Sequence, residues 1–125
     1  MKPTIKWNAD LFGVEIKTEK RHFVISAMPD SYMSDNEAVR FFDSPQGRGE
    51  HAWRLPKVAE WRIISAFLNE VNDMMLKNGG FVISIYGFYA SNYERRRAYW
   101  VGTRNFDGNY FGSLRVRSAC DIKNK

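Results

Sequence analysis

Apolar residues in the middle of the chain recur at steps of three and four. They run through the 58–75 stretch, just after Pro56. Such steps place side chains on one stripe of a helix, and the fixed φ and missing N–H of proline suit the start of a helix. Asn78-Gly79-Gly80 is a strong stop, because glycine accepts the left-handed cap conformation. The pattern predicts one long helix, within which Phe67–Glu70 allows a break, with Asn69 as the cap of a second segment.

The apolar stripe of this helix and the residues just before it are predicted to form the core. A stripe of aromatic, aliphatic and methionine side chains at helical spacing is typical of packing against other elements. The residues expected in the core are Trp53, Leu55, Trp61, Ile64 and Phe67.

Two stretches in the N-terminal half alternate apolar and polar residues. Leu11–Lys17 reads LFGVEIK and Arg21–Ser26 reads RHFVIS. This alternation is typical of strands with one buried face. Thr18-Glu19-Lys20 between them is short enough for a hairpin, and Met1–Asp10 is expected to form an N-terminal arm.

A capping box predicts a short helix after this hairpin. Ser34 is followed three residues later by Glu37, which is the spacing at which the two side chains satisfy each other's backbone N–H groups. The helix would run through Ala38 to Phe42. The next stretch, 43–51, is rich in Gly, Pro and polar residues, and we predict a loop there.

The C-terminal half carries the signals of an antiparallel sheet. Phe81–Tyr86 is a candidate buried strand, Ala98–Thr103 is the next strand, and Tyr110–Ala119 closes the sheet. Asn92–Arg96 reads as a polar turn, and Asp107-Gly108 is a turn signal. Strands first, helices in the middle and a sheet last is an α+β order. We expect a single α+β domain over residues 1–125, with two helices and an antiparallel sheet.

A motif of the form Arg-Leu-Pro-x-x-x-Glu-Trp stands at the start of the long helix. Its members are Arg54, Leu55, Pro56, Glu60 and Trp61. An aromatic segment over 88–93, an Ala-aromatic strand over 98–101 and a Val-Arg-rich strand over 114–117 follow it. This order resembles the bacterial and phage branch of the C-type-lectin-like fold. Within that branch the chain is most similar to the Fibrobacter succinogenes major paralogous domain family, and the motif is shared with the formylglycine-generating enzymes.

The resemblance implies a C-type-lectin-like domain that serves as a non-enzymatic recognition module, because relatives of this fold display variable loops on a stable scaffold. Formylglycine-generating catalysis, as the resemblance describes it, needs a pair of cysteines, and this chain has only Cys120. The related sulfoxide synthases need a histidine-rich iron site, whereas His22 and His51 are the only histidines. The calcium signatures of animal lectins are missing as well. We therefore expect no enzymatic activity, no intrachain disulfide, no required metal and no cofactor.

Composition and charge narrow the classes of partner. A net charge of +5 and a pI of about 9.5 favour anionic partners weakly. A hydrophobic content of 44% excludes a disordered tail as the main description. We see no signal peptide and no apolar run of membrane-spanning length, so a cytoplasmic location is the default expectation. The pattern leaves the oligomeric state open.

Aromatic residues and arginines gather in two predicted turns of the C-terminal sheet. Such residues anchor interfaces, and loops on a rigid scaffold are where recognition residues concentrate. The predicted binding residues are Tyr93, Arg95, Arg96, Arg97, Arg104, Phe106 and Tyr110. We expect these residues to bind a protein or glycan partner. The alternatives are a calcium-independent carbohydrate-binding protein that works by aromatic stacking and, ranked last, a basic nucleic-acid-binding module.

Overall fold

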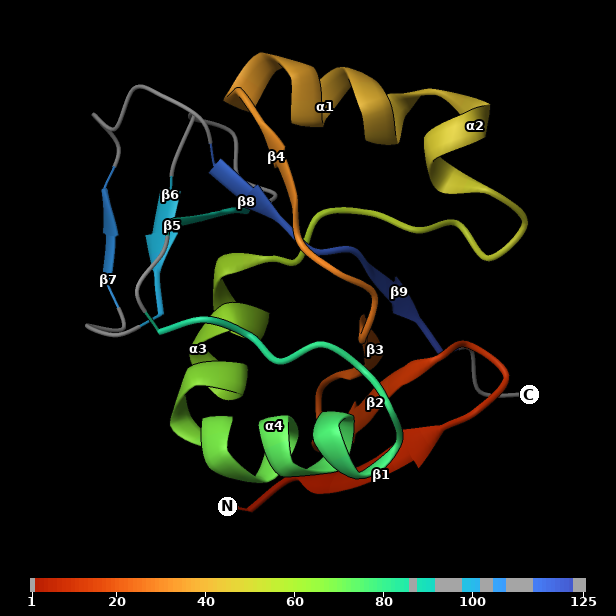
Figure 1. Cartoon of the computed structure of the whole chain (residues 1–125), viewed down its shortest axis with the longest axis vertical. Helices are drawn as coiled ribbons and strands as arrows, with labels where there is room; N and C mark the ends of the chain where they lie inside the picture. Colours follow the sequence, from red (N-terminus) through yellow and green to blue (C-terminus); the bar gives the residue numbers. More distant parts are fainter. Residues whose placement is uncertain (1, 86–87, 92–97, 102–104, 108–113, 123–125) are drawn as a thin grey trace.

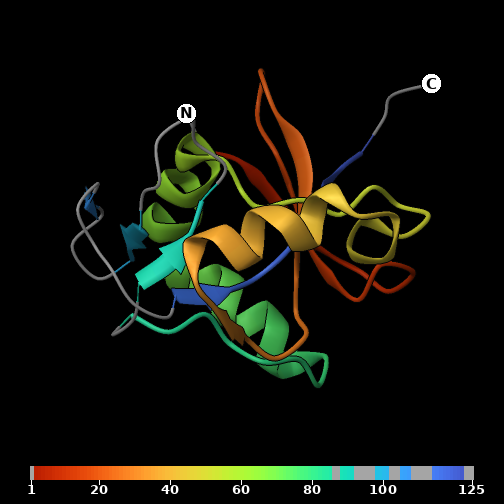
Figure 2. The same cartoon turned by 90° about the horizontal axis from the view of Figure 1, so that it is seen from above.

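The protein is an α+β molecule with two sheets, seen in a computed structural model that describes residues 2–85, 88–91, 98–101, 105–107 and 114–122. Figure 1 shows helices α1 and α2 at one end of the molecule and the hairpin of β1 and β2 at the other, beside helix α4. Figure 2, the view from above, shows α1 lying over the segment that joins β8 to β9. These helices are α1 (Asp35–Asp43), α2 (Pro45–Arg48) and α4 (Leu68–Lys77), and these strands are β1 (Thr4–Asn8), β2 (Gly13–Lys17), β8 (Leu114–Val116) and β9 (Ala119–Asp121).

The first sheet contains the predicted N-terminal hairpin. Its strands are β1 (Thr4–Asn8), β2 (Gly13–Lys17), β3 (His22–Ser26) and β9 (Ala119–Asp121), in the order β1-β2-β3-β9. All three pairings are antiparallel. The N-terminal hairpin and the last described strand therefore lie side by side.

The expectation that residues 1–10 form an arm was wrong for Thr4–Asn8. This segment is β1, and its residues pair in register with β2, for example Ile5 with Ile16. Ile5 and Trp7 pack against the core cluster, which explains why the segment is held. Their alternation with Thr4 and Lys6 is the period of a strand with one buried face.

The second sheet is mixed, where an antiparallel sheet was predicted. Its strands are β4 (Ser31–Met33), β5 (Phe88–Ala90), β6 (Ala98–Trp100), β7 (Asn105–Asp107) and β8 (Leu114–Val116), in the order β4-β8-β5-β6-β7. The pairing of β5 with β8, at Tyr89 and Arg115, is parallel. The predicted closing strand 110–119 was also wrong in part, because β8 and β9 belong to different sheets.

Four helices form in the described part of the chain, where two were predicted. They are α1 (Asp35–Asp43), α2 (Pro45–Arg48), α3 (Val58–Ala66) and α4 (Leu68–Lys77). The capping box of Ser34 and Glu37 at the start of α1 is confirmed. The predicted 43–51 loop contains α2, because Ser44 accepts a hydrogen bond from the N–H of Gly47 and Pro45 takes the first helical position. None of these four helices is both long enough and apolar enough to cross a membrane.

The long helix is broken where the sequence allowed a break. Phe67, with φ −120°, ends α3 and begins α4, so that Phe67 takes the capping position predicted for Asn69. The glycine stop is confirmed: Gly79 has φ +77°, and the N–H of Gly80 donates to the carbonyl of Met75 at 2.8 Å. The break turns one predicted helix into two that pack on different strands.

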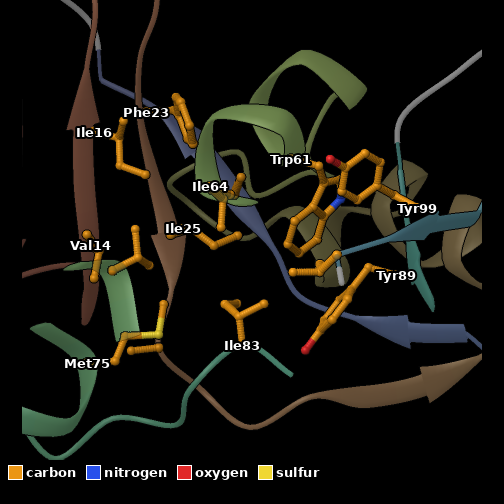
Figure 3. Close-up of a cluster of buried hydrophobic side chains, with 14 of the residues drawn as sticks. Val14, Ile16, Phe23, Ile25, Trp61, Ile64, Met75, Ile83, Tyr89 and Tyr99 are labelled. Carbon is orange, nitrogen blue, oxygen red and sulfur yellow. The ribbon is translucent and has the colours of Figure 1, made fainter. Parts of the chain in front are cut away.

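The side chain of Trp61 lies at the centre of the main core (Figure 3). It is fully buried, and its Nε1 donates to the carbonyl of Ala90 at 3.2 Å. Its ring centroid is 4.6 Å from that of Tyr89 and 6.2 Å from that of Tyr99, which stacks nearly parallel to it. The tryptophan of the motif thus joins α3 to strands β5 and β6.

The predicted core residues divide into two groups. Leu55, Trp61 and Ile64 are buried, as expected. Trp53 and Phe67 are only half-buried. Each of them lines a surface hollow, which the helical stripe did not predict.

The predicted buried strand at Phe81–Tyr86 was wrong for residues 81–85, which form no strand. Ile83 is buried, but the apolar side chains of Phe81, Val82 and Ile85 are exposed. Side chains hold the backbone in place of a neighbouring strand. Arg117 donates to the carbonyls of residues 81 and 82 at 2.6 and 2.9 Å, and Asn72 bonds both the N–H and the carbonyl of residue 83.

Candidate functional site

The binding residues predicted from the sequence fall almost entirely outside the described part of the chain. Those outside it are Tyr93, Arg95, Arg96, Arg97, Arg104 and Tyr110. Phe106 lies in β7, where its backbone pairs with Tyr99 of β6. The prediction that these residues form one surface therefore stays a prediction.

The strands that flank the predicted turns are described, and their register is informative. Ala90 of β5 pairs with Ala98 of β6, which in turn pairs with Asp107 of β7. Ala98 and Asp107 therefore lie at one end of these strands, and Trp100 and Asn105 pair at the opposite end.

An apolar cleft of about 290 Å³ lies on another part of the molecule, between strands β4 and β8 of the second sheet and helix α1. Ser31 and Met33 of β4 form one wall, and Phe41 and Phe42 of α1 form another. The remaining lining residues are Leu11, Ser26, Met28, Pro29, Gly47, Trp53, Val116, Arg117 and Ser118. Most of the lining side chains are apolar, and this hollow is the candidate site.

Local geometry fixes the aromatic walls of the cleft. The rings of Phe41 and Phe42 meet edge to face with centroids 5.0 Å apart. Gly47 packs so closely under the end of α1 that a Cβ there would lie 1.8 Å from the carbonyl oxygen of Phe41, so only glycine fits. The N–H of Trp53 donates to the carbonyl of Arg48 at 2.8 Å. The walls are therefore set by backbone contacts before any partner binds.

The mouth of the cleft exposes apolar side chains. Met28 is 57% exposed and Phe41 is 43% exposed, and both line the cleft. Val39 on the same helix is 47% exposed but does not line it. Large exposed apolar side chains beside a formed hollow are typical of interaction sites.

The charged group in the cleft lining is already engaged. The Arg117 side chain is 1% exposed, and each of its three guanidinium nitrogens donates to a protein acceptor. Its Nε donates to Asp30 Oδ1 at 2.8 Å, and its Nη1 donates to the carbonyl of Ser26 at 2.9 Å. The cleft therefore offers apolar contact area rather than a free cation.

The Arg-Leu-Pro motif has a structural role. Arg54 donates to both carboxylate oxygens of Glu60 at 2.7 Å and to Asp121 Oδ1 at 2.7 Å. Its backbone also forms two hydrogen bonds with Ala119. Burial alone would lower the pKa of Arg54, but the hydrogen bonds and charges of Glu60 and Asp121 raise it. The motif thus ties the start of α3 to the last strand.

Cys120 and the pair of Glu15 and His22 are the described groups closest in type to catalytic residues. Cys120 is buried in β9, and burial raises the pKa of its thiol to about 11, so the thiol stays neutral and unreactive. His22 Nε2 lies 2.8 Å from Glu15 Oε2. Within the described ranges no three His, Cys, Asp or Glu side chains lie close enough together to hold a metal ion.

The pair of Glu15 and His22 predicts a stability that depends on pH. Burial opposes ionisation of Glu15, but hydrogen bonds from His22 and Asn8 and the charge of Lys6 outweigh it and lower its pKa. Because the folded pKa is below the unfolded value of 4.5, this stabilisation is present above 4.5 and is lost as the pH falls through the folded pKa. Denaturant unfolding of Glu15→Gln should show a weaker decline of stability below that pH than the parent protein. Glu19→Gln, on the exposed turn, is the control and should decline as the parent does.

No protein-family model, curated protein or solved structure matches this chain.

Proposed function

We propose that this protein is a non-enzymatic recognition module that binds a partner protein, with the apolar cleft between β4 and α1 as the anchor site. One observation carries the proposal: a preformed apolar hollow has Met28 and Phe41 exposed at its mouth. Aromatic side chains that fill such hollows supply much of the affinity at protein interfaces. Methionine adapts its shape to different apolar partners.

The size of the cleft favours an anchoring side chain over a whole small molecule. A volume of about 290 Å³ is at the low end of ligand pockets, which span about 300–1,000 Å³. It accommodates one or two apolar side chains of a partner segment. Because the guanidinium of Arg117 is already hydrogen-bonded within the protein, the cleft also favours apolar over ionic recognition.

Carbohydrate binding is the second candidate, because Phe41 and Trp53 present aromatic rings in the cleft. Aromatic rings can stack on sugars without calcium, which is what the alternative of a calcium-independent carbohydrate-binding protein requires. The nucleic-acid alternative has no comparable support here, since the cleft lining lacks a free cation.

A C-type-lectin-like scaffold remains part of this proposal. It is supported by the antiparallel pairing of β3 with β9, which brings the N-terminal hairpin and the last described strand together. It is also supported by the role of Arg54 in tying α3 to β9. On such a scaffold the segments around Tyr93–Arg97 and Tyr110 would offer a second recognition surface, as the sequence predicts.

The proposal predicts that two cleft variants lose binding while a neighbouring variant keeps it. Peptides would be selected from a random library against the immobilised protein, and the best peptide would be titrated by calorimetry. Phe41→Ala and Met28→Ala should each weaken binding about tenfold, the effect of losing an anchor worth about 1.4 kcal/mol. Val39→Ala is the matched control, because Val39 has similar exposure on the same helix but lies outside the cleft lining.

The outcomes of this experiment separate the candidates. Thermal unfolding must first show that each variant is folded. Equal affinity in all three variants would refute the cleft as the anchor. Loss of binding only in a Tyr93→Ala, Arg96→Ala, Tyr110→Ala triple variant would move the site to the predicted turns. If no peptide is selected but a glycan-array ligand binds and depends on Phe41, carbohydrate binding is favoured. Binding of nucleic acid that weakens steeply with added salt would favour the nucleic-acid alternative.

A further inference from the structure

A second hollow, of about 360 Å³, has the opposite character to the apolar cleft. It forms where the turn between β2 and β3 approaches the start of α3 and the end of β9. Its lining residues are Lys17, Thr18, Glu19, Lys20, Arg21, His22, Lys57, Glu60, Asp121 and Ile122. It shares none of them with the apolar cleft. We call it the basic cleft.

Two of the three carboxylates in the basic cleft share one cation, the guanidinium of Arg54. Glu60 is 2% exposed and takes two hydrogen bonds from the guanidinium of Arg54. Asp121 accepts from the same guanidinium at 2.7 Å. These two carboxylates are therefore bound to the scaffold, and Glu19 remains as the acidic side chain without such a partner.

The cations that line the basic cleft outnumber its carboxylates. Four cations line it: Lys17, Lys20, Arg21 and Lys57. Among the described residues, none of the four has a carboxylate within ion-pair distance. By contrast, Lys2, just before β1, is paired with Glu70, and Lys6 of β1 is paired with Glu15. Four unpaired cations around one hollow repel each other unless an anion joins them.

Hydrogen bonds fix the backbone from which Lys20, Arg21 and Lys57 project. The hydroxyl oxygen of Thr18 accepts hydrogen bonds from the N–H groups of Lys20 and Arg21 at 3.3 and 3.0 Å. The N–H of Thr18 donates to the carbonyl of Arg21 at 2.8 Å, which closes the turn. At the start of α3, the backbone N–H of Lys57 donates to Glu60 Oε1 at 2.7 Å. This N–H is therefore not free to bind an anion, and the cleft offers the side chains instead.

We propose that the basic cleft binds an oxyanion, namely a phosphate or sulfate group, between the turn cations and Lys57. Ammonium and guanidinium groups form charge-assisted hydrogen bonds with such oxygens, and several of them can share one tetrahedral anion. The volume of the cleft leaves room for the group to be carried on a small molecule such as a sugar. This proposal uses no residue of the apolar cleft, so each of the two sites can fail independently.

The test is to titrate the protein with inorganic phosphate and, separately, with sulfate. Two-dimensional NMR of the backbone amides and calorimetry monitor each titration. The amide signals of residues 17–22 and 57 should shift, and those of Met28 and Phe41 should not. Lys20→Gln and Lys57→Gln should each weaken phosphate binding about threefold, as expected for a single exposed charge, and the double variant about tenfold. Added sodium chloride should weaken binding further.

Lys77→Gln is the matched control, because it removes the same charge from an exposed position in the last turn of α4. Equal losses in Lys77→Gln and Lys57→Gln would reduce the effect to general attraction by the net charge, and would overturn the site. Absence of any phosphate or sulfate binding would also overturn it. Glucose 6-phosphate compared with inorganic phosphate separates the sources: tighter binding of the ester favours a phosphorylated sugar, and equal binding favours the free anion.

Discussion

Replacing Trp61 with alanine should destabilise the protein by about 3–5 kcal/mol, the usual cost of deleting a large aromatic side chain from a core. The indole is fully buried, and it packs against Tyr89 and Tyr99 from the neighbouring sheet. Its truncation would also leave the carbonyl of Ala90 without its hydrogen-bond donor. Both losses would separate α3 from β5 and β6.

Denaturant unfolding followed by circular dichroism measures this effect. Trp53→Ala is the matched control, since Trp53 is only half-buried and belongs to the rim of the apolar cleft. It should cost clearly less than Trp61→Ala. A Trp61→Ala protein as stable as the parent would contradict the arrangement of the core around α3.

Replacing Arg117 with alanine should have an effect of similar size, about 3–5 kcal/mol, because it removes one partner of a buried ion pair. The side chain bonds Asp30 and three backbone carbonyls, those of residues 26, 81 and 82. Asp30 would keep a bond from Tyr89 and one from Arg115 at 3.2 Å but would lose its closest cation. The three carbonyls would also lose the hydrogen bonds that Arg117 donates.

Two variants distinguish this buried network from a surface ion pair. Arg115→Ala removes the second cation bonded to Asp30, but Arg115 is 30% exposed, and its loss should cost about 1 kcal/mol or less. Limited proteolysis adds a local readout, because residues 81–85 should become cleavable in Arg117→Ala and stay protected in Arg115→Ala. Equal stability of the two variants would show that Arg117 does not clamp this segment.

Several elements of the fold were predictable because their signals are local. The hairpin at Thr18–Lys20, the Ser34 capping box and the Gly79 stop each depend on residues a few positions apart. The burial of Trp61 followed from the helical period. In each case the hydrogen bonds or the periodic stripe form within one element, so neighbouring residues carry the whole signal.

Residues 81–85 show where that reasoning failed. A run of apolar residues after a glycine stop reads as a buried strand, yet its backbone is held by Arg117 and Asn72. The partner Arg117 lies more than thirty positions away, as the separation of 36 from Phe81 shows. The periodicity of apolar residues does not reveal a hydrogen bond between such distant residues. The exposure of Phe81 and Val82 could therefore not be predicted.

The apolar cleft could not be predicted from the sequence for the same reason. The turn residues predicted to bind a partner were chosen by residue type, whereas the apolar cleft joins Leu11, Phe41, Trp53 and Val116 from separate parts of the chain. One signal was available: the exposed pairing of Phe41 with Phe42 at the end of a short helix, where only one of the two can face the core.

The sequence alone determined the α+β class, the N-terminal hairpin, the Ser34 capping box, the Gly79 stop and the place of Trp61, since these follow from local hydrogen bonding and from the period of apolar residues. The tertiary structure alone decided that Thr4–Asn8 joins a sheet, that β8 and β9 part into different sheets, and that Arg54 links α3 to the last strand. It also decided which cations are unpaired around the basic cleft. These features depend on which distant side chains meet, and that is set by the packing of the whole chain rather than by any one stretch of it.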